Sequence, residues 1–411
     1  MFESEVVKIP PGTFCVQVSE EMKVPLTETQ FIGPYGIVLK FTGLDCSVVA
    51  LSKVDSSFKF KAWVFQFIAV IIIALSVLRC YTLFQLKGNS MSIQWAESGM
   101  FAFMGVQSVE CAYCIFSWTK KEFISNYLEK LEHLRLLRLK NNENLDNYSR
   151  LHLKVFVWTL IHTTITMVHS ITCAIQEKVI LSGDRIYPII YFGMPCLTLF
   201  VCIHVSVFLN CYYIVNSSLI REIEYFNLEL GTARKTKQLH KADVFIKFSH
   251  RHAELISLVR KANKSLGAYT FTTPISMFNA CINGVYMFFT FRDYLPSILN
   301  VILNLNVFAT LFMTYFSLRP ASRVQFHLED TSRILMECQE FENSEDSDII
   351  NTYHIMMKRS LNHNARLRVL GGIPIYPTTF NTAMFFIPSL GTLLSFVKKS
   401  LHTYGLEMEH H

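Results

Sequence analysis

The feature that most constrains this chain is its alternation of long apolar stretches with loops of very different charge. Seven stretches are apolar over at least the ~20 residues needed to cross a bilayer core of about 30 Å. Across the 411 residues 51% are hydrophobic, and no soluble domain of independent size fits between the stretches. The sequence therefore predicts a polytopic membrane protein. The stretches are 63–86, 96–118, 153–175, 187–215, 269–291, 294–318 and 369–397.

Lysine and arginine lie almost entirely on one side of these stretches. Alternate gaps, beginning with the N-terminal segment, carry 31 of the 38 Lys and Arg residues, whereas the remaining gaps and the C-terminal tail carry 6. Lys and Arg stay in the cytoplasm during insertion, so this asymmetry predicts a cytoplasmic N-terminus and an extracellular C-terminus. We expect an all-α fold of seven transmembrane helices with long cytoplasmic helical extensions. This orientation is the inverse of that of a G-protein-coupled receptor.

Several classes of function do not fit the composition. The net charge of +6 comes from basic residues in the predicted cytoplasmic loops, so we expect no nucleic-acid partner. The predicted outer loops contain no cysteine, which leaves no extracellular disulfide framework. Nucleotide-binding loops, zinc helices and serine elbows are absent from the sequence. We therefore expect no enzyme, no metal site and no cofactor.

The loops divide the chain into four segments. Residues 1–62 form a cytoplasmic N-terminal segment, and 63–318 carry the first six transmembrane helices with their cytoplasmic helical loops. Residues 319–368 are expected to form cytoplasmic anchor helices. The last segment, 369–411, holds the seventh transmembrane helix and a short extracellular tail.

Three predicted cytoplasmic regions show the periodicity of amphipathic helices. In 121–140, 241–262 and 347–366, large apolar residues recur at spacings of three and four. Such stripes have to be buried, either against one another or against a second subunit. The stripes comprise Phe123, Tyr127, Leu131, Leu134 and Leu137; Phe245, Phe248, His252, Leu255 and Val259; and Ile349, Tyr353, Met356, Met357 and Leu361.

Polar residues inside the apolar stretches are the candidates for a binding site. A charge in hydrocarbon costs on the order of 3 kcal/mol unless it faces a partner or water. The candidates cluster in the outer halves of several stretches, where aromatic rings accompany amides, hydroxyls and a carboxylate. This mixture is typical of an amphipathic ligand pocket, although hydrogen bonds between helices would use the same residues. The candidate ligand-binding residues are Trp95, Glu97, Phe101, Gln107, Thr166, His169, Tyr191, Asn283, Tyr286 and Phe289.

The seventh stretch carries many small hydroxyl residues for a helix that faces lipid. Thr382, Ser389, Leu393 and Phe396 fall on one side of it at helical spacing. A helix lining a shared water path would need such a side. Close helix packing around Gly391 would also explain the small residues, and both interpretations stay open.

These features together resemble the insect gustatory and odorant receptor superfamily. The inverted topology, minimal outer loops and long helical inner loops match its architecture. Its motif-level resemblance is confined to 365–403, where Gly371, Gly372 and Ile373 precede an aromatic-rich helix. Ser395 and Phe396 stand where gustatory receptors usually carry Thr-Tyr. An odorant-receptor alignment through Leu393–Tyr404 fits nearly as well.

The resemblance implies a multi-pass chemoreceptor of the plasma membrane. It implies a tetrameric, ligand-gated, nonselective cation channel, homomeric or heteromeric, opened by a small-molecule tastant or odorant. In this family the seventh helix lines the pore, which would give Thr382, Ser389, Leu393 and Phe396 roles in the pore or gate. The ligand would bind in the outer half of the bundle.

Lys398 and Lys399 depart from the family's terminal pattern. Copies of these lysines near an outer mouth would repel cations, unless they lie beyond the pore or are offset by Glu407 and Glu409. Two alternatives therefore stay open. The chain could be an odorant-receptor subunit of a heteromeric channel, or a seven-helix receptor that signals through a cytosolic partner.

Overall fold

The computed structural model describes most of the chain from the predicted second transmembrane stretch onward. The predicted first stretch, 63–86, lies outside the described residues except at position 67, and so does most of the N-terminal segment 1–62. The described residues are 28–42, 67, 93–138, 148–180, 187–293, 295–338, 341, 346–361, 368–369, 373–374 and 376–403.

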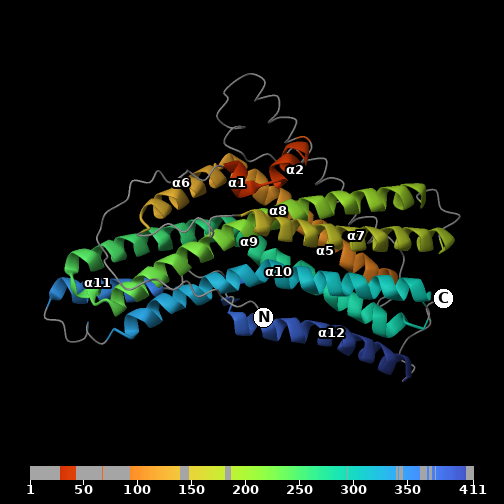
Figure 1. Ribbon diagram of the computed structural model, residues 1–411. Coiled ribbons are helices and arrows are strands. Elements are labelled where there is room, and N and C mark those ends of the chain that lie inside the picture. The colour runs from red at the N-terminus through yellow and green to blue at the C-terminus, as the bar shows by residue number, and fades with distance from the viewer. Residues whose placement is uncertain are drawn as a thin grey trace, which may run out of the picture.

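Long helices dominate the described residues and run side by side along the molecule (Figure 1). The longest, α9, has 50 residues, which corresponds to about 75 Å at ~1.5 Å per residue. This length exceeds a membrane core of about 30 Å, so the predicted transmembrane stretches continue into helical extensions. The main helices are α5 (Ile93–Lys120), α6 (Phe123–Leu136), α7 (Ser149–Ile180), α8 (Tyr187–Lys235), α9 (Ala242–Phe291), α10 (Ser297–Met336), α11 (Ser347–Ser360) and α12 (Pro377–Thr403).

The shorter elements are helices near the N-terminus and a connection between long helices. They are α1 (Glu28–Ile32), α2 (Tyr35–Thr42) and the 3₁₀ turn η2 (Gln238–His240). Phe31 and Ile32 of α1 are buried and belong to the main hydrophobic core. The Tyr35 hydroxyl of α2 lies 2.8 Å from Thr159 Oγ1 on α7. These contacts attach the N-terminal helices to the side of the bundle.

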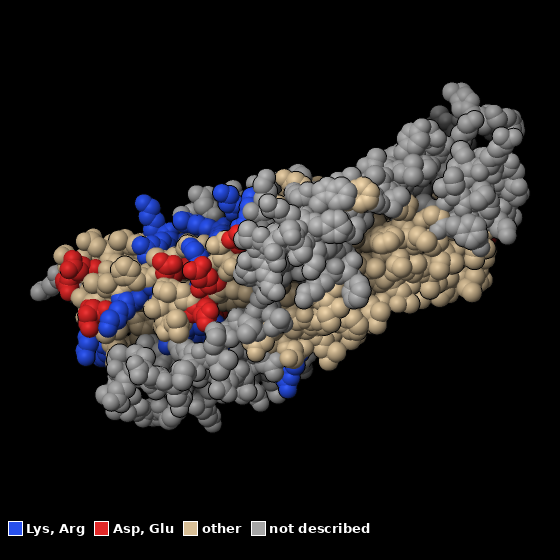
Figure 2. All heavy atoms as spheres, turned by 90° about the horizontal axis from the view of Figure 1, so that it is seen from above, with Lys and Arg blue, Asp and Glu red and all other residues tan. Residues whose placement is uncertain are grey.

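The charged and apolar parts of the molecule are separated along its length. Seen from above, Lys, Arg, Asp and Glu gather toward the end where α11 and the last turns of α10 lie (Figure 2). The described surface at the opposite end of this face carries none of these residues. Such separation is what a membrane half and a water-exposed half require.

Three of the described helices are long and apolar enough to cross a membrane, judged by length and composition. They are Ser149–Ile175, Pro195–Lys235 and Ser297–Met336. Six of the seven predicted stretches coincide wholly or largely with described helices. The count of seven transmembrane helices and the orientation of the termini stay predictions.

The seventh helix begins later than the predicted start at residue 369. The strands β1 (Arg368–Val369) and β2 (Ile373–Pro374) pair antiparallel, so this region is not entirely helical. Helix α12 begins at Pro377, and proline suits the first position of a helix because its missing N–H has no intrahelical partner there. Apolar content alone did not separate the strand pair from the helix.

The three amphipathic stripes are buried within this chain. In α9, every member of the predicted stripe is buried, from Phe245 to Val259. In α6 the stripe is buried except for Leu137, which is exposed. In α11, Ile349 and Met356 are buried, Tyr353 and Met357 are partly buried, and Leu361 is exposed. The rings of Phe245 and Phe341 stack at 4.6 Å, and Phe341 contacts Tyr353 of α11. The stripes therefore pack against other parts of the same chain.

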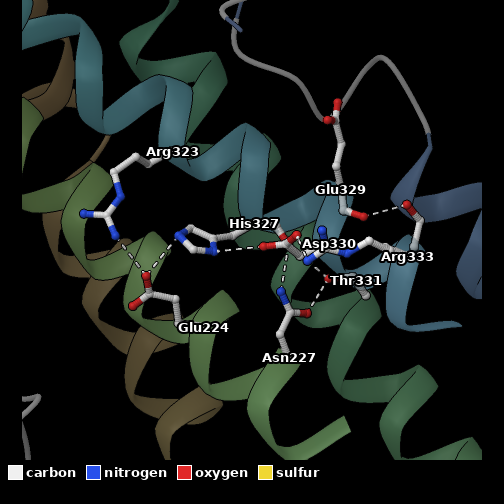
Figure 3. A network of polar contacts seen from close by, with 9 residues as sticks. Glu224, Asn227, Arg323, His327, Glu329, Asp330, Thr331 and Arg333 are labelled. Carbon is white, nitrogen blue, oxygen red and sulfur yellow. Dashed lines mark hydrogen bonds and ion pairs between the residues drawn. The ribbon is translucent and has the colours of Figure 1, made fainter. Parts of the chain in front are cut away.

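Polar contacts join α8 to α10 in the charged half (Figure 3). His327 Nε2 lies 2.9 Å from Glu224, and Arg323 lies 3.1 Å from the same carboxylate. Asn227 donates to the backbone oxygen of His327 at 2.8 Å and accepts from Thr331 at 2.6 Å. These contacts fix the relative register of the two helices.

Candidate ligand-binding site and pore helix

A small cavity lies where α5, α7, α8, α9 and α10 meet. It combines amide, imidazole and hydroxyl groups with methionine and aliphatic side chains, the mixture typical of a small-molecule site. Its volume is about 20 Å³, enough for about one water molecule. A larger guest would have to displace the flexible side chains of Met100 and Met277. The lining residues are Met100, Gln107, His162, Val201, Cys202, Val205, Ser276, Met277, Ala280, Asn306 and Thr310.

Asn306 is the centre of a polar network beside this cavity. Its side-chain Nδ2 donates to His169 Nδ1 at 2.9 Å, and its Oδ1 accepts from Thr166 Oγ1 at 3.4 Å. Nδ2 also lies 3.8 Å from the sulfur of Met100. Thr310 donates to the backbone oxygen of Asn306 at 2.8 Å. Three helices, α5, α7 and α10, thus converge on one buried amide.

Gln107 provides a buried hydrogen-bond donor that is available to a bound small molecule. Its side chain is 3% exposed, and its Nε2 has no hydrogen-bond partner among the described residues. A buried donor without an acceptor is unfavourable by about 1–3 kcal/mol. A bound molecule with a carbonyl, ether or hydroxyl oxygen would satisfy it.

The structure brings together part of the predicted ligand site. Gln107 lines the cavity, and Thr166 and His169 belong to the network around Asn306. The side chains of the other predicted residues on α5 and α8 lie outside the described part of the chain. These are Trp95, Glu97, Phe101 and Tyr191.

The predicted residues on α9 lie elsewhere. Asn283 is buried and packs closely against Gly99 of α5. If Gly99 carried a Cβ, that atom would lie only 3.0 Å from Asn283 Nδ2. Tyr286 is fully buried in a separate apolar cluster with Ala96 and Leu303. Phe289 is 46% exposed. None of the three lines the cavity, and their roles in binding stay predictions.

Sequence reasoning missed Asn306, His162 and Thr310. The signal was present, since Asn306 and Thr310 are polar residues one helical turn apart in an apolar stretch. What the sequence did not show is that this face of α10 meets Thr166 and His169 of α7.

Within the described part of the chain, no three His, Cys, Asp or Glu side chains gather as a metal site would require.

Helix α12 has two contrasting faces. One face packs tightly on α9, because a Cβ added at Gly391 would meet the Ile282 backbone oxygen at 2.6 Å and the Val285 Cβ at 2.7 Å. The opposite face holds the predicted pore residues, and all of them are exposed. Leu393 is 55% exposed and Phe396 is 67% exposed, and Thr382 and Ser389 lie beside them.

The two interpretations of the seventh stretch concern different sides of one helix, and the pore role of the exposed side stays a prediction. Gly391 and the buried Ser395 lie on the packed side, and Thr382 and Ser389 lie on the exposed side. Thr382 and Ser389 donate their hydroxyls to carbonyls of their own helix, at 3.0 Å and 3.1 Å. Their oxygens still have lone pairs that could accept from water.

Lys398 does not lie on the exposed face of α12. Its ammonium nitrogen lies 4.8 Å from the centroid of the Phe291 ring at the end of α9. A lysine in this position is attracted to the face of the ring. Lys398 thus points away from the side that carries Leu393 and Phe396.

Solved structures show what fold this arrangement represents. The chain is similar to the insect olfactory receptor OR5 from Machilis hrabei in complex with eugenol, with a TM-score of 0.62 and 11% identity over 89% of this chain and 98% of that chain. A second structure of the same receptor gives a TM-score of 0.62 and 10% identity over 88% and 96% of the two chains. The chain therefore has the insect olfactory receptor fold. Together with its apolar helices, this fold indicates a membrane protein.

The family of the chain follows from its sequence. The model of the family described as "Caenorhabditis protein of unknown function, DUF267" matches residues 31–391, and the chain belongs to that family. No curated protein matches it. Both similar structures are of one olfactory receptor, so the preference for the gustatory branch stays a prediction.

Proposed function

We propose that this chain is a chemosensory receptor of the plasma membrane that acts as a ligand-gated, nonselective cation channel. The observation that carries the proposal is the exposed face of α12, which mixes hydroxyls with large apolar side chains. A single chain leaves this face uncovered. Several copies around a common axis, four by analogy with the receptor family, would turn it toward a shared water path. The proposal assigns the chain no enzymatic activity and no cofactor.

The apolar members of this face suit a gate. Leu393 and Phe396 lie about one turn apart on α12, and copies of them around an axis would form a narrow apolar ring. Such a ring closes a channel by dewetting, with no need for a charged plug. Lys398 lies against Phe291, which keeps that charge away from the ring, whereas Lys399 is exposed.

The cavity around Asn306 is the proposed ligand site. It lies where α5, α7, α8, α9 and α10 meet. Because α10 also contacts α12, a guest that moved α10 would act on the proposed gate. Its mixed lining favours a small molecule with an oxygen acceptor and an apolar body. One of the similar structures is an olfactory receptor in complex with eugenol, which makes molecules of that kind sensible first probes.

The experiment is expression of the chain in oocytes with confirmed surface delivery, followed by a panel of sugars, bitter compounds and odorants. We expect an inward cation current for at least one compound. Asn306→Leu should raise the half-maximal concentration by about tenfold, equivalent to about 1.4 kcal/mol. The matched control is Asn304→Leu, two residues away on α10 and outside the cavity.

Two results would count against the proposal. Silence across a broad panel, with the protein present at the surface, would argue against a channel formed by this chain alone. Ligand binding without conductance would instead favour a receptor that acts through a cytosolic partner.

A further inference from the structure

A long apolar groove opens on the side of the bundle between α7, α10 and α12. Its volume is about 600 Å³, and its walls are almost entirely aromatic and aliphatic. Phe308 of α10 and Phe385 of α12 are 68% and 82% exposed at its rim. Deeper in the groove, the rings of Trp158 and Phe312 pack at 4.0 Å. A groove of this kind is shaped for an extended apolar chain.

Two of the three helices that form the groove, α7 and α10, carry basic residues at the same end. On α7, Lys154 lies one turn before Trp158, on the face that lines the groove. On α10, Arg319 lies one turn after Tyr315, again on the lining face. Lys154 Nζ is 5.6 Å from the Phe316 ring, and Arg319 Cζ is 5.2 Å from the Tyr315 ring. Arg319 thus lies beside a ring that lines the groove, and Lys154 lies beside Phe316, whose ring stacks with that of Phe312 in the groove wall.

These cations are not neutralised locally. Lys154 and Arg319 are exposed, and in the part of the chain that the structure describes neither has a carboxylate within ion-pair distance. Arg319 and Arg323 are the like charges that act on Lys154. Arg323 is paired with Glu224 (Figure 3), which leaves a net positive charge at the groove's end.

We propose that this groove binds an anionic phospholipid. Its acyl chain would lie along the ring of Trp158 and past Phe308, and its phosphate would be held between Lys154 and Arg319. An apolar channel leading to unpaired cations complements an amphipathic anion, and basic pockets between membrane helices recognise such headgroups. On the orientation predicted from the sequence, the lipid would belong to the cytoplasmic leaflet. The site does not depend on whether the chain conducts ions.

The test uses the full chain purified into nanodiscs of phosphatidylcholine with or without phosphatidylserine, followed by native mass spectrometry of the retained lipid. Each Lys or Arg near an anionic surface contributes about 1 kcal/mol, a factor of about five in affinity. We expect the Lys154→Gln, Arg319→Gln double variant to retain phosphatidylserine about 25-fold less well. The control, Arg260→Gln, removes an exposed charge on α9 away from the groove and should retain it like the unmodified chain.

A second variant tests the groove without changing its charge. Ala309→Phe fills the groove from α10 and should also reduce phosphatidylserine retention, with unaltered size-exclusion behaviour as the check of folding. Glycerophosphoserine, which has the headgroup but no chains, should not compete. Equal retention of phosphatidylcholine and phosphatidylserine would overturn the proposal and fit a second copy of the chain covering the groove. Unchanged binding in the double variant, or competition by the soluble headgroup, would also overturn it.

Discussion

Two buried ion pairs hold the inner parts of the helices together at the level of single residues. Arg138, after α6, is paired with Glu222 of α8, and Arg251 of α9 is paired with Glu229. The Arg138 guanidinium also lies 4.1 Å from the Tyr225 ring. Buried pairs of this kind are weak evidence for stability, but they are costly to break singly because an unpaired charge is left behind.

Loss of one partner of the Arg138 pair should therefore destabilise the chain strongly. We expect Glu222→Gln to reduce the free energy of unfolding by about 3–5 kcal/mol, since Arg138 would remain buried without a counter-charge. Arg333→Gln is the matched control. Arg333 is 67% exposed in its pair with Asp330, and its loss should change stability by less than about 1 kcal/mol. Equal effects of the two substitutions in detergent unfolding would contradict the importance of burial.

His252 should make stability depend on pH. It is buried in α9, stacked on Phe226 at 5.5 Å, and burial together with the nearby charge of Arg359 lowers its pKa from the ordinary 6.5 to about 3. Between these values the unfolded chain binds a proton that the folded chain does not. The contribution of His252 to the free energy of unfolding is therefore fully present above pH 6.5. It is lost as the pH is lowered, by up to about 1.4 kcal/mol per pH unit.

The measurement for His252 is thermal unfolding at pH 7 and pH 5. The unmodified chain should lose stability at the lower pH, and His252→Gln should lose less because it cannot be protonated. His250→Gln, an exposed neighbour on the same helix, serves as the control and should behave like the unmodified chain. An identical pH profile for His252→Gln and the unmodified chain would show that the group does not contribute.

At the scale of elements, the close contact between α9 and α12 depends on Gly391. An added methyl group would come within 2.6 Å of the Ile282 backbone oxygen, which cannot move aside without shifting a helix. We expect Gly391→Ala to lower the free energy of unfolding by about 1–3 kcal/mol.

Gly231 of α8 provides a matched control for that substitution. No atom lies within 4 Å of a Cβ placed there. Alanine should therefore be neutral or stabilising by about 0.5–1 kcal/mol, since it favours the helix more than glycine does. Comparable destabilisation by the two alanines would mean that α12 does not depend on close approach at Gly391.

Elements whose pattern is local were predictable from the sequence. The stripe from Phe245 to Val259 is buried as its spacing indicates, because helical periodicity depends only on neighbouring residues. The start of α12 was not predictable from hydropathy, since residues 369–374 before Pro377 carry no charge and are largely apolar. The network at Asn306 depends on which faces of α7 and α10 meet, and that is set by packing between distant segments.

At the scale of the whole molecule, the inner helices are buried against one another within one chain, whereas α12 is buried only on the side that faces α9. Its exposed face is the surface that an assembly would have to cover or hydrate. The charged half, held by contacts such as that between His327 and Glu224, would stay in water (Figure 3). Whether α12 lines a pore therefore distinguishes a channel from a membrane receptor of another kind.

The most direct test needs no ligand. It measures resting cation current in oocytes that express equal surface amounts of the unmodified chain, Leu393→Ser, Phe396→Ser and Met384→Ser. Met384 is the control, since it is half-buried in the groove beside α10 rather than on the exposed face of α12. If α12 lines and closes a pore, serine at Leu393 or Phe396 should wet the apolar ring and raise the leak severalfold, and serine at Met384 should not. A closed resting state with ordinary ligand sensitivity in both ring variants would show that this helix does not form the gate.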